Sequence, residues 1–144
     1  MAKADITCFG SNNGEINVQA INNVGNIASV EWSANASNTT DSQATGLSAV
    51  IYTFSLVDDN GCEVSVADTI NEPSPIVIND FELFPNLCVG DRKGRISISA
   101  RGGIGTLNFN WSNGSNSAQL MDVPSGNYEV AITDANDCLI TESF

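Results

Sequence analysis

The chain contains no histidine and few positively charged residues. Without histidine it lacks the usual general base of nucleophilic catalysis and the commonest zinc ligand. Lys and Arg total 5 against 17 Asp and Glu, so the formal net charge is −12. This charge disfavours nucleic acid and anionic membrane surfaces as partners. The composition therefore predicts a protein that is not an enzyme and that binds no nucleic acid.

Long apolar runs are also missing. No stretch is long enough to cross a bilayer as a helix, and no export signal follows Met1. No segment carries an apolar period of 3.6 residues over a useful length, so helices are not expected. We expect no membrane insertion, and we expect the chain to be a piece excised from a longer exported protein.

What the sequence does contain is a repeat. The residue pattern of positions 47–62 recurs at positions 123–138, with Tyr52 and Tyr128 lying 76 positions apart. Each copy runs from a tyrosine through an alternating strand into an Asp-x-Asn-x turn that ends on a cysteine. A period of this size indicates tandem modules. We predict two domains, residues 1–73 and 74–144, joined by a short, semi-rigid linker that contains Pro73 and Pro75.

The apolar residues alternate as they do in β-strands. Ile16, Val18 and Ala20 should face one core, as should Ala28, Val30 and Trp32. Asn13-Gly14 before such a run is typical of a hairpin turn. We predict an all-β fold of two tandem immunoglobulin-like antiparallel β-sandwich domains, with a tyrosine corner in each. The expected strands are residues 15–21, 27–32, 62–67, 76–84, 94–100 and 107–112, and those opening at Tyr52 and Tyr128.

Each copy has two cysteines, Cys8 with Cys62 and Cys88 with Cys138. Four cysteines allow three pairings, and the repeat favours one bridge inside each copy. Closing the 54-residue loop from 8 to 62 is worth roughly 4 kcal/mol in the chain-entropy model. Such bridges indicate an oxidising compartment. Zinc is the alternative, and the absence of C-x-x-C spacing argues against it.

Several segments together resemble the SprB repeat of long surface adhesins in gliding Bacteroidota. They are residues 7–16, 111–114, 123–128 and 133–138. The resemblance implies tandem extracellular modules, exported by the type IX secretion system and carried at the cell surface as adhesive filaments for gliding motility. Copy one departs from copy two at Val50 in place of Gly126 and at Asn22-Asn23 in place of Gly102-Gly103. Copy two has Asp137 where copy one has Gly61.

The Asp-x-Asn-x turns are the candidate metal sites, because they offer the hard oxygen ligands that Ca²⁺ prefers. Two or three ligands in one turn fall short of the six to eight that Ca²⁺ takes, and Asp and Asn also suit turns for conformational reasons. We favour the turn role and expect no cofactor, with calcium as the alternative. The candidates are Asp58, Asp59, Asn60, Asp134, Asn136 and Asp137. Trp32 and Trp111 are expected in the core. The alternative is that their rings are exposed and stack on sugars.

The function predicted from these features is structural and adhesive: a repeat module within a long filament, in contact with neighbouring repeats. One alternative is a module that binds a glycan or surface polysaccharide, through the polar loop 33–42 or the basic residues between Arg92 and Arg101. Another is a subunit that polymerises by adding residues 76–84 to the sheet edge of a neighbour.

Overall fold

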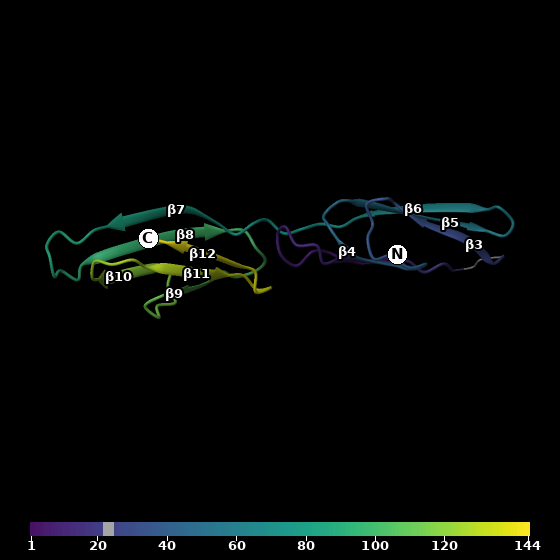
Figure 1. Cartoon of the computed structure of the whole chain (residues 1–144). Helices are drawn as coiled ribbons and strands as arrows, with labels where there is room; N and C mark the ends of the chain where they lie inside the picture. The colour runs from purple at the N-terminus through teal and green to yellow at the C-terminus, as the bar shows by residue number, and fades with distance from the viewer. Residues whose placement is uncertain (22–24) are drawn as a thin grey trace. The chain divides into compact units, whose positions relative to one another are not determined.

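The structure is a computed structural model that describes residues 1–21 and 25–144, and it divides into two compact units (Figure 1). Unit 1 is Met1–Glu72 and unit 2 is Pro73–Phe144. The described residues form twelve β-strands and no α-helix, so none of their segments is a helix able to cross a membrane. The predicted all-β fold is confirmed.

Unit 1 consists of two three-stranded antiparallel sheets. One sheet has the order β1-β2-β4 and the other the order β3-β5-β6. The strands are β1 (Ala2–Ala4), β2 (Gly14–Asn17), β3 (Ile27–Trp32), β4 (Gln43–Leu47), β5 (Ile51–Asp58) and β6 (Glu63–Thr69).

Unit 2 has the same plan with a longer first strand. Its sheets have the orders β7-β8-β10 and β9-β11-β12, again antiparallel. The strands are β7 (Val77–Phe84), β8 (Gly94–Arg101), β9 (Asn108–Trp111), β10 (Gln119–Val123), β11 (Glu129–Thr133) and β12 (Leu139–Ser143).

The core of unit 2 lies between its two sheets and shows why alternation builds a sandwich. In β11, Val130 and Ile132 are fully buried while Ala131 between them is partly exposed. They pack with Ile96 and Ile98 of β8 in the facing sheet, so both sheets contribute to one apolar cluster. The other buried members of this cluster are Ile76, Trp111, Leu120 and Val123.

The core of unit 1 is smaller. Its buried members are Ile6, Ile16, Ala44, Leu47, Tyr52 and Ile70. Of the positions expected to face inward, Ala20 and Ala28 are exposed, so that part of the prediction is wrong. The reason is the length of the sheet. β2 ends at Asn17 and β1 spans only three residues, so neither strand extends far enough to cover Ala20 or Ala28.

The turns and corners agree with the prediction only in part. Asn13-Gly14 forms no two-residue hairpin, because Gly14 begins β2 and the Asn13 side chain instead bonds Thr7. β4 and β10 were not anticipated. Both tyrosine corners are present: the Tyr128 hydroxyl donates to the Pro124 carbonyl at 2.9 Å, and the Tyr52 hydroxyl lies 3.1 Å from the Ser48 amide, whose N–H it accepts.

Candidate functional site

The two Asp-x-Asn-x turns are built alike around their first carboxylate. Asp58 accepts the N–H groups of Asn60 at 2.9 Å and of Cys62 at 2.8 Å. At the equivalent turn, one oxygen of Asp134 accepts from Asn136 at 2.8 Å and from Cys138 at 3.0 Å. These bonds fix the β5–β6 and β11–β12 hairpins, as an Asx turn does.

The Asp134 carboxylate of unit 2 accepts one hydrogen bond more from the backbone than the Asp58 carboxylate of unit 1. The second oxygen of Asp134 accepts the Ile104 N–H at 2.8 Å, and the residue is only 2% exposed. Three backbone donors therefore hold this carboxylate. The Ile104 N–H, followed by those of Cys138 and Asn136, lowers the pKa of Asp134. In unit 1 the Cys62 N–H, followed by that of Asn60, lowers the pKa of Asp58.

The remaining calcium candidates also have turn roles. Asp59 accepts from the side chains of Asn26 and Asn60, both at 3.2 Å. Asp137 has φ of 60° and Gly61, its counterpart, has φ of 80°, a left-handed conformation that Asp tolerates. Across residues 1–21 and 25–144, no three acidic or cysteine side chains gather as a metal site. The structure thus gives these residues a turn role, and calcium binding stays an untested alternative.

The tryptophans pack against the cores and anchor loops. Trp111 is 2% exposed, and its Nε1 donates to the Ser117 carbonyl at 2.7 Å. Trp32 is partly buried, packs edge-on against Phe54 at 4.9 Å between ring centroids, and donates to the Thr40 carbonyl at 2.9 Å. The expected core position is thus found for Trp111 and in part for Trp32.

The basic residues between Arg92 and Arg101 do not form one patch. Arg92 lies in the loop before β8, whereas Arg101 ends that strand, roughly 23 Å further along at 3.3 Å per residue. Arg95 stacks over Phe84, with the guanidinium carbon 5.3 Å from the ring centroid. The polar segment 33–42 is a loop apart from an isolated bridge between Thr39 and Ala44.

Residues 76–84, the expected polymerising segment, largely form β7. This strand pairs with β8 of its own unit and is the edge of its sheet. Phe81 and Leu83 on it remain about half exposed. The edge is available in principle for a further strand, although no contact in the structure tests that alternative.

Unit 1 has an apolar cavity that the sequence did not indicate. It has a volume of about 690 Å³ and lies between the segment 18–21 and the β5–β6 hairpin. Leu56, Val64 and Cys62 are among its lining residues. The first strand of this unit is short, which leaves β5 and β6 partly uncovered and the cavity open.

The cysteines differ from the prediction. Cys62 and Cys88 carry free, exposed thiols, and Cys8 and Cys138 are disulfide-bonded. The prediction of one disulfide inside each copy is therefore wrong. In unit 1 the Cys8 loop lies by Glu72, whose carboxylate accepts the Gly10 N–H at 2.8 Å. Cys62 is at the opposite end of β6, roughly 20 Å away. Disulfides require Cα atoms within about 7 Å.

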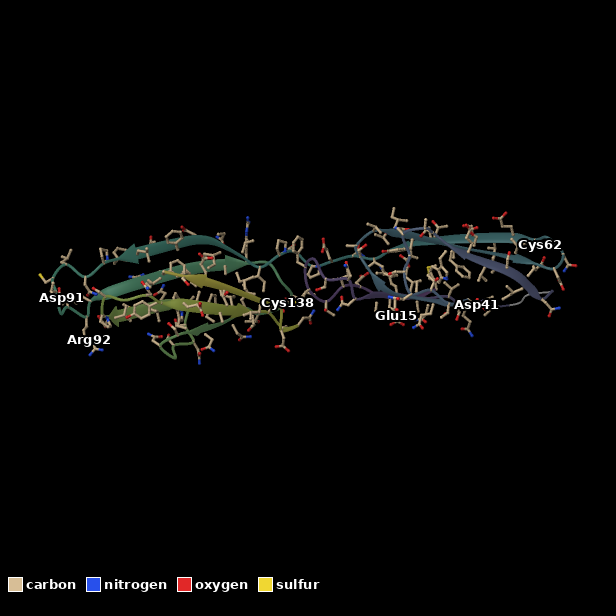
Figure 2. All side chains as sticks on the ribbon, in the orientation of Figure 1. Glu15, Asp41, Cys62, Asp91, Arg92 and Cys138 are labelled. Atoms are coloured by element: carbon tan, nitrogen blue, oxygen red, sulfur yellow. The ribbon has the colours of Figure 1, made fainter. Side chains whose placement is uncertain are left out.

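Unit 2 separates its cysteines in the same way. The Cys88 loop lies by the start of β8, where the Asn86 amide donates to the Val123 carbonyl at 3.0 Å. The Cys138 turn lies by the other end of β8, because Ile104 just beyond that strand bonds Asp134. Figure 2 shows Cys138 at one end of this unit and Asp91 with Arg92 at the other.

Residues 84–116 match the family model described as the SprB repeat. Over these residues the chain is similar to the SprB repeat. The matched residues all lie in unit 2 and run from the end of β7 past β9. The SprB repeat occurs in cell-surface adhesins, so this match suggests an adhesin-type repeat module. No curated protein matches it.

Proposed function

We propose that the chain is a spacer in an extracellular adhesin filament, where its sandwiches hold an adhesive end away from the cell. One observation carries this proposal: several polar residues that occur in both copies hold the fold. The tyrosine hydroxyls close corners, the tryptophan Nε1 groups anchor loops, and Asp58 and Asp134 bind turn amides.

The proposal is tested by pulling the chain from its two ends in the presence of a reductant. Two units with separate cores should unfold in two events, each releasing roughly 250 Å of chain at about 3.5 Å per residue. Smooth extension without discrete events would contradict a load-bearing role. The same chain on beads should not be retained on surfaces coated with polysaccharides.

Retention on one polysaccharide would favour the second candidate, a surface-binding module. The cavity of unit 1 is the observation that supports this alternative, because ligand sites are concave and mostly apolar. Leu56→Asp would place a charge in the cavity and abolish such retention. Arg101→Ala, in the other unit, is the matched control.

A further inference from the structure

Both free thiols lie at the far end of a unit, by which we mean the end opposite to residues 72–75. In unit 1 the Cys8 loop is beside Glu72, so the hairpin with Cys62 is at the far end. In unit 2 the Gly103 N–H donates to the Ser74 carbonyl at 2.9 Å, so the Cys138 turn is near residues 72–75 and Cys88 is at the far end.

The far end of unit 2 is an apolar and basic projection. Leu87 and Val89, on either side of Cys88, are fully or almost fully exposed, at 92% and 109%. Arg92 and Lys93 follow in the same loop, together with Asp91. Exposed apolar side chains gathered at one point mark a contact surface.

The far end of unit 1 is an apolar hollow with an acidic rim. Leu56, Val64 and the Cys62 side chain line the cavity of about 690 Å³. Asp58 and Glu63 also line it, and Asp59 is exposed beside them. No Lys or Arg lies within residues 4–91, so no cation adjoins this end in the sequence.

The two far ends are complementary in charge and in chemistry. One offers two exposed apolar side chains, two cations beside one acid, and a thiol, and the other offers an apolar hollow, three acids and a thiol. We propose that these ends dock on each other in successive copies of the chain, with the partner a second copy in head-to-tail order and Cys88 of one copy bridged to Cys62 of the next.

The bridge forms by thiol–disulfide exchange with a low-molecular-weight disulfide such as glutathione disulfide. One thiolate attacks this disulfide, giving a mixed disulfide and one glutathione thiol. The second thiolate then displaces the other glutathione. The two cysteines lose two protons and two electrons in total, and two glutathione thiols receive them.

A head-to-tail interface is heterologous, so it propagates into a filament unless the rotation between copies closes a ring. This inference goes beyond the proposed function, because a chain that failed to bear load could still form the bridge, and a load-bearing chain could lack it. The two experiments therefore fail independently.

The test uses the complete chain in a buffer of reduced and oxidised glutathione. Wild type should give a ladder of covalent oligomers on a non-reducing gel. Cys62→Ser and Cys88→Ser, each alone, should remain monomeric. Mixed in equal amounts they should form a covalent dimer that grows no further, since each partner has one thiol left. Peptide mapping should find Cys62 joined to Cys88.

A dimer from either variant alone would overturn the proposal, because it would require a symmetric bridge. No dimer from the mixture would overturn it equally. Both cysteines are exposed, so serine should leave the fold unchanged, which gel filtration and circular dichroism will check.

Charge variants in the Cys62→Ser partner test the docking itself. Arg92→Glu should slow formation of the mixed dimer by about fivefold at low ionic strength, because an attractive charge becomes repulsive. Arg101→Glu makes the same change of charge at the other end of β8 and should have little effect. Equal slowing by both variants would contradict docking through the Cys88 loop.

Discussion

Ile132 and Leu56 stand at the same place in the two copies, 76 residues apart, yet their surroundings differ. Ile132 is fully buried, whereas Leu56 is partly exposed and lines a cavity. The next strand shows the same contrast: Ile140 of β12 packs against the core of unit 2, and Val64 of β6 is 51% exposed. Equivalent residues thus need not be equally buried.

The first strand accounts for this difference. β7 has eight residues and pairs along β8 as far as Arg101, whereas β1 has three and reaches only Asn17 of β2. The segment of β7 around Ile78 therefore covers the end of unit 2 that in unit 1 stays open. A sandwich this small depends on each strand, because few others can replace the lost apolar surface.

The largest expected effect tests this contrast directly. Ile132→Ala should destabilise unit 2 by about 2–5 kcal/mol, as large-to-small changes in a packed core do. Leu56→Ala should cost unit 1 about 1 kcal/mol, because water already reaches that side chain. Urea unfolding measures both, with Trp32→Phe leaving Trp111 to report unit 2 and Trp111→Phe leaving Trp32 to report unit 1. Equal losses would show that unit 1 is as well packed as unit 2.

The second effect concerns the glycine pair that only copy two has. Gly102 has φ of 94°, and a Cβ there would lie 1.8 Å from the Pro75 carbonyl oxygen. Gly102→Ala should therefore cost unit 2 about 2–4 kcal/mol from steric overlap and the left-handed backbone. Asn22 and Asn23, at this place in copy one, lie outside the described residues.

Gly114→Ala is the matched control for that variant. Gly114 has φ of 86°, but nothing lies within 4 Å of the added Cβ. This change should cost only about 1 kcal/mol, for the backbone alone. If the two variants unfold at the same urea concentration, close approach of the chain at residue 75 is not what requires Gly102.

Much of the fold follows from the sequence because alternation and burial are local. Ile27–Trp32 forms β3 as predicted, and the strands that open near Tyr52 and Tyr128 lie where the period puts them. β4 and β10 escaped notice because each is short and irregular. Gly46 in β4 and Asp122 in β10 have positive φ, and β10 contains a bulge, so neither strand alternates cleanly.

The sequence shows which cysteines are equivalent in the two copies, but it does not show which cysteines form disulfides. The period shows that Cys8 matches Cys88 and that Cys62 matches Cys138. It does not show at which end of the sandwich each loop lies, because that depends on how the strands are connected. The cavity beside Cys62 also depends on a property of the whole unit, the reach of its first strand, and has no motif of its own.

The third expected effect is a loss of stability at acid pH, which should be larger in unit 2 than in unit 1. The pKa values of Asp134 and Asp58 are both lowered in the folded protein, so their stabilisation is complete above the unfolded value of about 3.9. It is lost as the pH falls through the lower, folded value. Asp134→Asn should flatten this loss in unit 2 and lower the urea midpoint at pH 7.

Asp58→Asn is the matched change in unit 1 and should lower its midpoint at pH 7 by less. An asparagine at 134 has one oxygen to accept with, and its amide donor would face the Ile104 N–H, whereas the contacts at 58 use one oxygen only. Urea unfolding between pH 2.5 and 7, followed in the single-tryptophan backgrounds, checks this. A larger change in unit 1 would mean that the third bond of Asp134 adds nothing.

The smallest expected effect is a loss of stability that should be larger in unit 1 than in unit 2. Tyr52 is 1% exposed, and its hydroxyl lies 3.1 Å from the Ser48 amide, 3.2 Å from its hydroxyl and 3.3 Å from its carbonyl. Partly buried Tyr128 makes one bond, to the Pro124 carbonyl. Tyr52→Phe should cost unit 1 about 1 kcal/mol, and Tyr128→Phe about half of that, since solvent can replace a partner at an exposed corner. Ser48→Ala removes only the hydroxyl contact, so a Tyr52→Phe, Ser48→Ala double-mutant cycle isolates that pair. A coupling energy near zero would assign the cost to the Ser48 backbone, whose N–H has no counterpart at Pro124 because proline carries none.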